Sequence, residues 1–316
     1  EDMRLRTVNK GLGAPDARLP VNVGEDLVFA LSGRGDVRLA LTTDKGSGLG
    51  VGVAQAADKL DLRMSDGDLL PLTGDPAGNL LAENLSAPDI DLSASEGRIG
   101  GTPGGSDSAL SPDGALTVDS PERGRVSAQA ADSVNLRAPA GDLPVETVDA
   151  GGAARLAAQN LDDRAGAGPA RDVAVGDRVD VEGDLTVLAA RDVRLSPEAD
   201  IGSGGSASVT TIAGDVEVGR HASLRADETI GIVVPGANRF SMAQESRVDA
   251  DRSLAVTVGT GGDDVDTPSG AIAMAQGAAL SSGGDIDLAA GERVELATVQ
   301  TQASPDQAPE NPDALD

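Results

Sequence analysis

The stretch that decides the fold of this chain runs from residue 183 to residue 219 and reads GDLTVLAARDVRLSPEADIGSGGSASVTTIAGDVEVG. It contains short runs in which apolar and polar residues alternate, such as Leu-Thr-Val at 185–187, Val-Arg-Leu at 193–195 and Val-Glu-Val at 216–218. Turns rich in Gly, Asp, Ser and Pro separate these runs. Alternation with a period of two is typical of a half-buried strand, and these turn residues favour sharp bends. The stretch therefore predicts a series of short β-strands joined by tight turns.

The same phrase recurs along the chain. Gly-Asp or a charged residue comes first, an apolar–polar–apolar triplet follows, and a turn ends the phrase. A phrase repeated in this way indicates a repeat protein, in which each copy has the same structural role. Copies outside the first stretch lie at 35–41, 89–94, 133–138, 284–290 and 292–298.

The spacing of the expected strands limits the topology, because consecutive strands start only six to eight residues apart. A parallel crossover through a helix needs a dozen residues or more, so β-α-β units are excluded. Three strand-and-turn units give a coil of roughly 20 to 24 residues, which is the period of a solenoid. The expected starts lie near Asp172, Arg178, Asp184, Asp192, Asp200, Ser208, Asp215 and Ser223.

We therefore predict an all-β fold, a right-handed parallel β-helix with short strands at 6–8 residue spacing. A β-sandwich built from short strands is the alternative. The Ala-rich runs 53–64 and 152–161 are candidates for short helices that cap or decorate the tube.

The composition agrees with a thin interior. The chain has 316 residues with no Cys, Trp or Tyr, two Phe and one His. These absences exclude a disulfide framework, a cysteine zinc site and a multi-histidine metal site. Aromatic residues usually dominate core packing, so aliphatic side chains must fill this core alone. A net charge of −27, from 52 acidic and 25 basic residues, excludes nucleic acid as a partner.

Three regions differ in regularity. Residues 1–110 are an irregular β-rich region with Gly and Pro interruptions, and residues 111–300 carry the regular β-helix repeats. Residues 301–316 form an acidic Pro-rich tail or linker. No stretch approaches 18 apolar residues, so no transmembrane segment is predicted. The start at Glu1 without a signal segment is interpreted as a mature form or a piece of a longer polypeptide.

The acidity has more than one interpretation. Only three of the 25 basic residues are Lys, at positions 10, 45 and 59, which leaves 22 Arg. A dense carboxylate surface keeps a protein soluble in brine, which is typical of a halophilic protein. Codon bias of a GC-rich genome predicts the same composition, and calcium binding is a further possibility. All three interpretations stay open at the level of the sequence.

Residues 183–219 and the phrase GGDIDLAAGERVELAT at 283–298 resemble the repeats of filamentous-haemagglutinin-like exoproteins. These are repetitive β-helical adhesins of Gram-negative bacteria, many of them exported by two-partner secretion. The resemblance extends well over 115–300 and loosely over 26–100. The secretion-signal motif Asn-Pro-Asn-Leu is missing, since Asn311-Pro312-Asp313 departs from it at the third residue. The resemblance implies a shaft segment that is extracellular or on the cell surface of a Gram-negative bacterium.

Two motifs are candidate binding sites. Arg34-Gly35-Asp36 matches the tripeptide of integrin ligands, although Gly-Asp before an apolar triplet is also the chain's own repeat phrase. Asp263, Asp264 and Asp266 crowd one Gly-rich loop, and calcium prefers several oxygen ligands at once. These residues are the predicted receptor-binding and calcium-binding candidates, and calcium is the only cofactor considered.

Other patterns do not support a catalytic or nucleotide site. The glycines between Gly46 and Gly52 fail the G-x-G-x-x-G spacing that a dinucleotide-binding turn requires. His221 is the only His, and no G-x-S-x-G surrounds a serine nucleophile. We therefore predict that the protein is not an enzyme.

The function expected is that of a non-enzymatic extracellular structural or adhesive protein, a β-helical rod or filament-forming segment of a bacterial surface fibre. Unpaired backbone groups on the end coils of a β-helix must be capped or joined. The expected partners are therefore a second copy end to end or neighbouring segments of a longer chain, and a host or neighbouring cell surface. A ligand-binding module for a glycan, receptor or calcium is the alternative, and a polysaccharide-degrading β-helix enzyme is least favoured.

Overall fold

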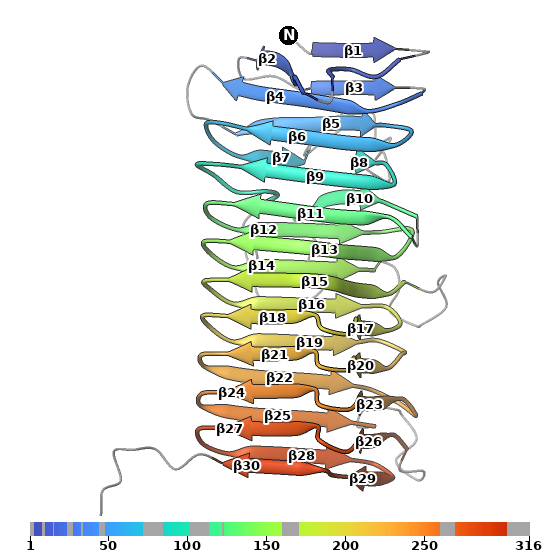
Figure 1. The fold of residues 1–316 in the computed structure, drawn as a ribbon, viewed down its shortest axis with the longest axis vertical. Helices are drawn as coiled ribbons and strands as arrows, with labels where there is room; N and C mark the ends of the chain where they lie inside the picture. Colours follow the sequence, from blue (N-terminus) through green and yellow to red (C-terminus); the bar gives the residue numbers. More distant parts are fainter. Residues whose placement is uncertain are drawn as a thin grey trace, which may run out of the picture.

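A computed structural model describes residues 3–7, 10–14, 16–23, 28–32, 34–43, 48–71, 85–101, 114–121, 123–159, 171–259 and 269–301. These residues form thirty β-strands and no helix, stacked as a tube with the N-terminal strands at one end (Figure 1). Every pairing between named strands is parallel. The predicted parallel β-helix is confirmed. The β-sandwich alternative is wrong, because its hairpins need antiparallel pairs.

Two sheets run along the tube. The first, sheet A, consists of β1 (Met3–Thr7), β3 (Val28–Ser32), β5 (Leu49–Gln55), β7 (Leu69–Pro71), β8 (Leu85–Ser86), β10 (Leu116–Asp119), β12 (Val134–Ala138), β14 (Ala154–Ala158), β16 (Leu185–Ala189), β19 (Ala207–Thr211), β22 (Thr229–Val234), β25 (Ser253–Val258) and β28 (Ile286–Ala290).

The second, sheet B, begins as one ladder and then divides. Its undivided part consists of β2 (Leu19–Val23), β4 (Val37–Thr43), β6 (Lys59–Met64), β9 (Asp89–Ala94), β11 (Arg125–Ala130), β13 (Leu143–Ala150) and β15 (Val173–Val181). One branch continues as β17 (Val193–Leu195), β20 (Val216–Val218), β23 (Arg239–Met242), β26 (Ala271–Met274) and β29 (Arg293–Glu295). The other continues as β18 (Asp200–Ser203), β21 (Ser223–Ala226), β24 (Arg247–Ala250), β27 (Ala279–Ser282) and β30 (Thr298–Thr301).

The division grows from bulges that widen coil by coil. Between β11 and β13 the register shifts by one residue, Glu146, and β15 adds two residues at the same place, Gly176 and Asp177. In the next coil the four residues 196–199 separate β17 from β18. A bulge bends and twists its strand, so the growing insertion turns a two-sided coil into a three-sided one.

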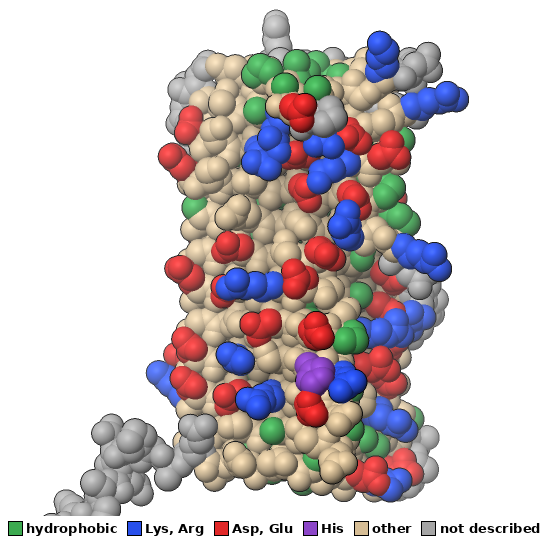
Figure 2. Space-filling model, in the orientation of Figure 1, with side chains coloured by type: hydrophobic (Ala, Val, Ile, Leu, Met, Phe, Trp, Pro, Cys, Tyr) green, Lys and Arg blue, Asp and Glu red, His purple; other side chains and the backbone are tan. Residues whose placement is uncertain are grey.

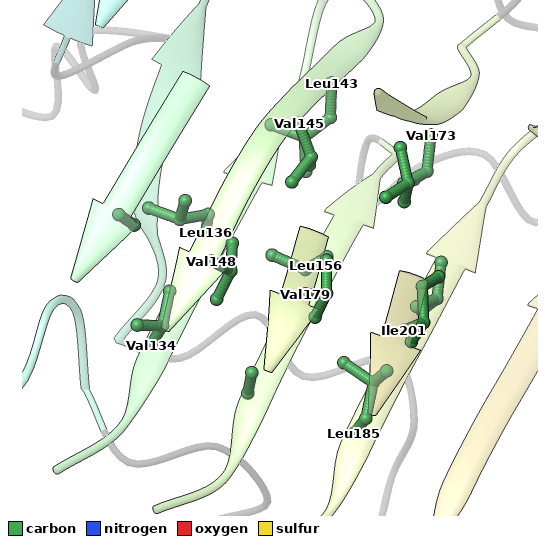
Figure 3. Close-up of a cluster of buried hydrophobic side chains, with 14 of the residues drawn as sticks. Val134, Leu136, Leu143, Val145, Val148, Leu156, Val173, Val179, Leu185 and Ile201 are labelled. Carbon is green, nitrogen blue, oxygen red and sulfur yellow. The ribbon is translucent and has the colours of Figure 1, made fainter. Parts of the chain in front are cut away.

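The core is a set of columns in which each coil contributes one inward side chain to each column. Figure 3 shows part of it, with aliphatic side chains from both sheets pointing toward one another. Val187, Val193 and Val216 are almost completely buried, as period-two alternation requires. The column on β16 runs through Leu116, Leu136, Leu156, Val187, Val209, Ile232, Val256 and Leu288.

The Gly-Asp phrase has a structural role at the coil starts. The backbone N–H of Asp215 donates to Oδ1 of Asp192 in the preceding coil, at 2.9 Å. A Cβ on Gly214 would lie 2.3 Å from that same oxygen, so the glycine leaves room for the carboxylate. The same bond, from a backbone N–H to an Asp of an earlier coil, recurs at Arg98 to Asp68, Asp172 to Asp142, Asp192 to Asp172, Ser206 to Asp184 and Arg239 to Asp215.

The predicted strand starts agree with the structure with one exception. Asp172 and Arg178 were expected to begin separate strands, but β15 runs through both positions without a turn. The short helices expected at 53–64 and 152–161 are wrong, because β5, β6 and β14 occupy these runs. Coils from β17 onward repeat at 23 and 24 residues, since Val193 pairs with Val216 and Val216 with Phe240.

The sheets continue across the expected boundary at residue 110. β8 pairs with β10 and β9 pairs with β11, so the coils on both sides belong to one tube. Of the expected tail 301–316, only Thr301 lies among the described residues. The described residues include no apolar helix of membrane-spanning length.

Candidate functional site

The Arg-Gly-Asp tripeptide begins β4 near the N-terminal end of the tube. Arg34 is exposed, and Gly35 has a φ of 91°, which a glycine adopts without strain. The carboxylate of Asp36 accepts hydrogen bonds from Nη2 and Nε of Arg38, at 2.7 and 3.0 Å. Its backbone carbonyl accepts from the N–H of Leu12 at 2.8 Å. The tripeptide therefore starts a strand as other copies of the repeat phrase do, with its carboxylate already bound.

The calcium candidates Asp263, Asp264 and Asp266 lie outside the described residues. Within the described ranges, no group of three His, Asp or Glu side chains is placed to hold a metal ion.

His221 lies in a stack of turns formed by the insertion that divides sheet B. It has a φ of 59°, and Glu198 and Glu245, in the coils before and after, have φ values of 68° and 61°. Nδ1 of His221 lies 3.0 Å from Oε2 of Glu245, and both side chains are exposed (Figure 2, purple for His221). An exposed pair of this kind contributes little to stability. The contact aligns two turns and has no nucleophile beside it.

The most buried ion pair is centred on Asp172, at the start of β15. Its side chain is 3% exposed and contacts Nη2 of Arg191 at 2.5 Å and Nη1 of Arg194 at 2.6 Å. Burial raises the pKa of the Asp172 carboxyl, but the hydrogen bonds from Arg191 and from the Asp192 N–H, with the charges of both arginines, outweigh it and lower the pKa overall. Because the carboxylate is fully compensated, its role is to join consecutive coils.

The C-terminal end coil differs from all the coils before it. Three interior columns end there, at Leu288 in β28, Val294 in β29 and Val299 in β30. The earlier members of these columns are buried, whereas Val294 is 44% exposed and Val299 is 39% exposed. Leu296, next to β29, is 48% exposed. Interior side chains of the last coil are uncovered because no described strand stacks on them.

The opposite end offers a similar surface. Leu5, Leu12 and Leu19 are only partly buried against the core, and hydrophobic side chains gather at this end of the tube (Figure 2). Leu19 and Val299 are the first and last members of one column. Its members between them are Leu39, Leu62, Leu92, Ala128, Val148, Val179, Ile201, Leu224, Val248 and Leu280.

No family model, no curated protein and no solved structure matches this chain.

Proposed function

We propose that this chain is a non-enzymatic structural segment of an extracellular bacterial surface fibre, a β-helical rod whose C-terminal end coil stacks on another β-helical coil. The observation that carries the proposal is the uncovered interior of that end coil at Val294, Leu296 and Val299. A parallel ladder with a free edge and an apolar interior accepts one more strand of the same kind.

The size of the effect supports stacking. Burying a Val or Leu side chain completely contributes about 1.5–3 kcal/mol, so covering the exposed part of each contributes about 1 kcal/mol. The unpaired backbone groups of β28, β29 and β30 add hydrogen bonds on stacking. A head-to-tail contact repeats without closing, so it generates a filament.

The partner we propose is the N-terminal end coil of a second copy. Leu19 at that end and Val299 at the other belong to the same interior column, so a stacked copy continues the column in register. The placement at a Gram-negative cell surface is supported by the resemblance of 183–219 and 283–298 to haemagglutinin-like repeats.

Sedimentation velocity over a range of protein concentrations tests this proposal. We expect the wild-type protein to form rods longer than one chain, and V299D to weaken the association at least about tenfold, since it places a charge against an apolar end. Val233 provides the matched control, because it is 40% exposed but points outward from β22 in the middle of the tube. A wild-type protein that stays a single rod, or equal effects of V299D and V233D, would overturn end-to-end stacking.

A further inference from the structure

A groove crosses the outer face of sheet B, away from both ends of the tube. It has a volume of about 390 Å³ and extends over five neighbouring strands, β6, β9, β11, β13 and β15, which lie side by side in Figure 1. Strands in a sheet are about 4.8 Å apart, so the groove is about 19 Å long. Its length along the tube axis suits an extended chain molecule.

The groove exists because outward side chains are small at its centre and large at its ends. One outward row reads Asp61, Asp91, Ser127, Thr147 and Arg178 in successive coils. The second row, two residues further along each strand, reads Arg63, Ser93, Gln129, Asp149 and Asp180. Ser and Thr form the floor, and Arg and Asp form the walls.

The bulges of sheet B lie beside this floor. Ser127, Thr147 and Arg178 are the first residues after the point where the register shifts on β11, β13 and β15. On the far side of that point Glu146 stacks over Gly176, where a Cβ would come within 3.0 Å of the Glu146 carboxylate. Bulges often occur next to binding sites because they redirect side chains. Here they bend the sheet along one margin of the groove.

Most charges in the groove are already paired. Arg18 binds Asp61 through Nη2 at 2.6 Å and Nε at 3.1 Å, Lys59 binds Asp91, and Arg178 binds Asp180. The carboxylate of Asp149 has only a long contact of 3.5 Å from Nε2 of Gln129. Among the described residues, no hydrogen bond engages the hydroxyls of Ser93, Ser127 or Thr147, which face the groove. The groups left for a ligand are thus hydroxyls, an amide and one carboxylate.

We propose that this groove binds a strand of neutral polysaccharide. Hydroxyls, an amide and an accepting carboxylate match the sugar hydroxyls of such a chain, which both donate and accept hydrogen bonds. The net charge of −27 opposes the binding of acidic glycans. Binding along the tube wall adds adhesion to the structural role and does not depend on end-to-end stacking.

Isothermal titration calorimetry with defined hexasaccharides tests the proposal. The neutral probes are maltohexaose, cellohexaose, laminarihexaose and chitohexaose, and the acidic probe is hexagalacturonate. We expect at least one neutral probe to bind with a Kd below about 1 mM, and the acidic probe not to bind. Failure of all four neutral probes at about 10 mM, or binding of the acidic probe alone, overturns the proposal.

Two variants assign the binding to the groove. S127M fills the floor without adding an aromatic platform, and S208M makes the same change at an exposed outward position of β19 on sheet A. S127M is expected to weaken binding at least about tenfold, and S208M to leave it unchanged. D149A, at an exposed residue, gives a second reading that does not disturb the floor, with an expected loss of about three- to tenfold. Equal affinities of wild type, S127M and D149A overturn the assignment.

The stacking variant separates this proposal from the rod. V299D changes the end coil, which is remote from β6–β15 in Figure 1. If V299D loses end-to-end association and keeps saccharide binding, the two functions are independent. If it loses both, the groove as described here is not the binding site.

Discussion

At the scale of single residues, the Gly-Asp phrase joins each coil to the next through a carboxylate and the space left for it. Gly214 cannot carry a side chain because its Cβ would lie 2.3 Å from both Oδ1 of Asp192 and the backbone of Arg191. Gly231, in β22, has nothing within 4 Å of the same position. The two glycines are therefore required to different degrees, although both precede an apolar residue in the sequence.

We predict that G214A lowers the free energy of unfolding by about 2–3 kcal/mol, because the added methyl group must displace the carboxylate or the backbone. G231A should leave stability unchanged or raise it by up to about 1 kcal/mol, since alanine restricts the unfolded chain. Urea unfolding followed by circular dichroism measures both. Equal values for the two variants would contradict the steric role of Gly214.

A second prediction concerns acid stability. The folded pKa of Asp172 lies below its ordinary value of 3.8, so the native state binds a proton less readily than the unfolded chain does. Its contribution to stability is therefore complete above pH 3.8 and is lost as the pH falls through the folded pKa. D172N should cost about 2 kcal/mol at pH 7 and reduce the slope of stability against pH in the acid range. Parallel pH profiles of wild type and D172N below pH 4 would contradict the assignment.

At the scale of strands and coils, most of the fold follows from the sequence pattern. Alternation placed the strands, and Val187, Val193 and Val216 point inward as that pattern requires. The pattern did not show that β15 is continuous, because a bulge at Gly176 and Asp177 and a turn at 196–199 look alike in composition. Pro197 lacks an N–H for the ladder and is consistent with the break in the later coil.

The predicted helices failed for a related reason. The run Val53–Met64 is rich in Ala, but its second half, Lys59–Met64, alternates in register with β4 and β9. Packing against neighbouring coils overrides the intrinsic preference of Ala for helix.

The inward register can be tested on one strand. V187D places a charge in the β16 column, where Val187 is 1% exposed, and should cost more than about 4 kcal/mol or abolish folding. T186D changes the neighbouring outward residue of the same strand and should cost less than about 1 kcal/mol. Thermal unfolding measures the difference, and comparable losses in both variants would show that the strand faces the other way.

At the scale of the whole molecule, the two proposed functional surfaces were not accessible from the sequence. Val294, Leu296 and Val299 lie in ordinary copies of the repeat phrase, and only the stacking order shows that they belong to the last described coil. The groove likewise depends on register, which brings Ser127 beside Thr147 from 20 residues further along the chain. The predicted Arg34-Gly35-Asp36 motif, in contrast, was visible in the sequence but is a copy of the phrase that starts strands.

The charge of the molecule sets the conditions for assembly. Two copies that each carry a net charge of −27 repel one another, whereas the stacked ends are apolar. Salt screens the repulsion, with a Debye length of about 8 Å at 0.15 M and about 3 Å at 1 M. We predict that the mean rod length rises with NaCl concentration, as measured by light scattering. A rod length that falls as salt is added would indicate ion pairs, rather than apolar side chains, at the junction.

Electron microscopy of the purified protein in about 1 M NaCl tests the central claim, that the tube continues end to end through its uncovered coil. We predict unbranched fibres of constant width, with a spacing of about 4.8 Å along the axis from stacked strands, that are shortened to single rods in V299D but not in V233D. Single rods in the wild-type protein, or fibres that persist unchanged in V299D, would contradict stacking at the end coil.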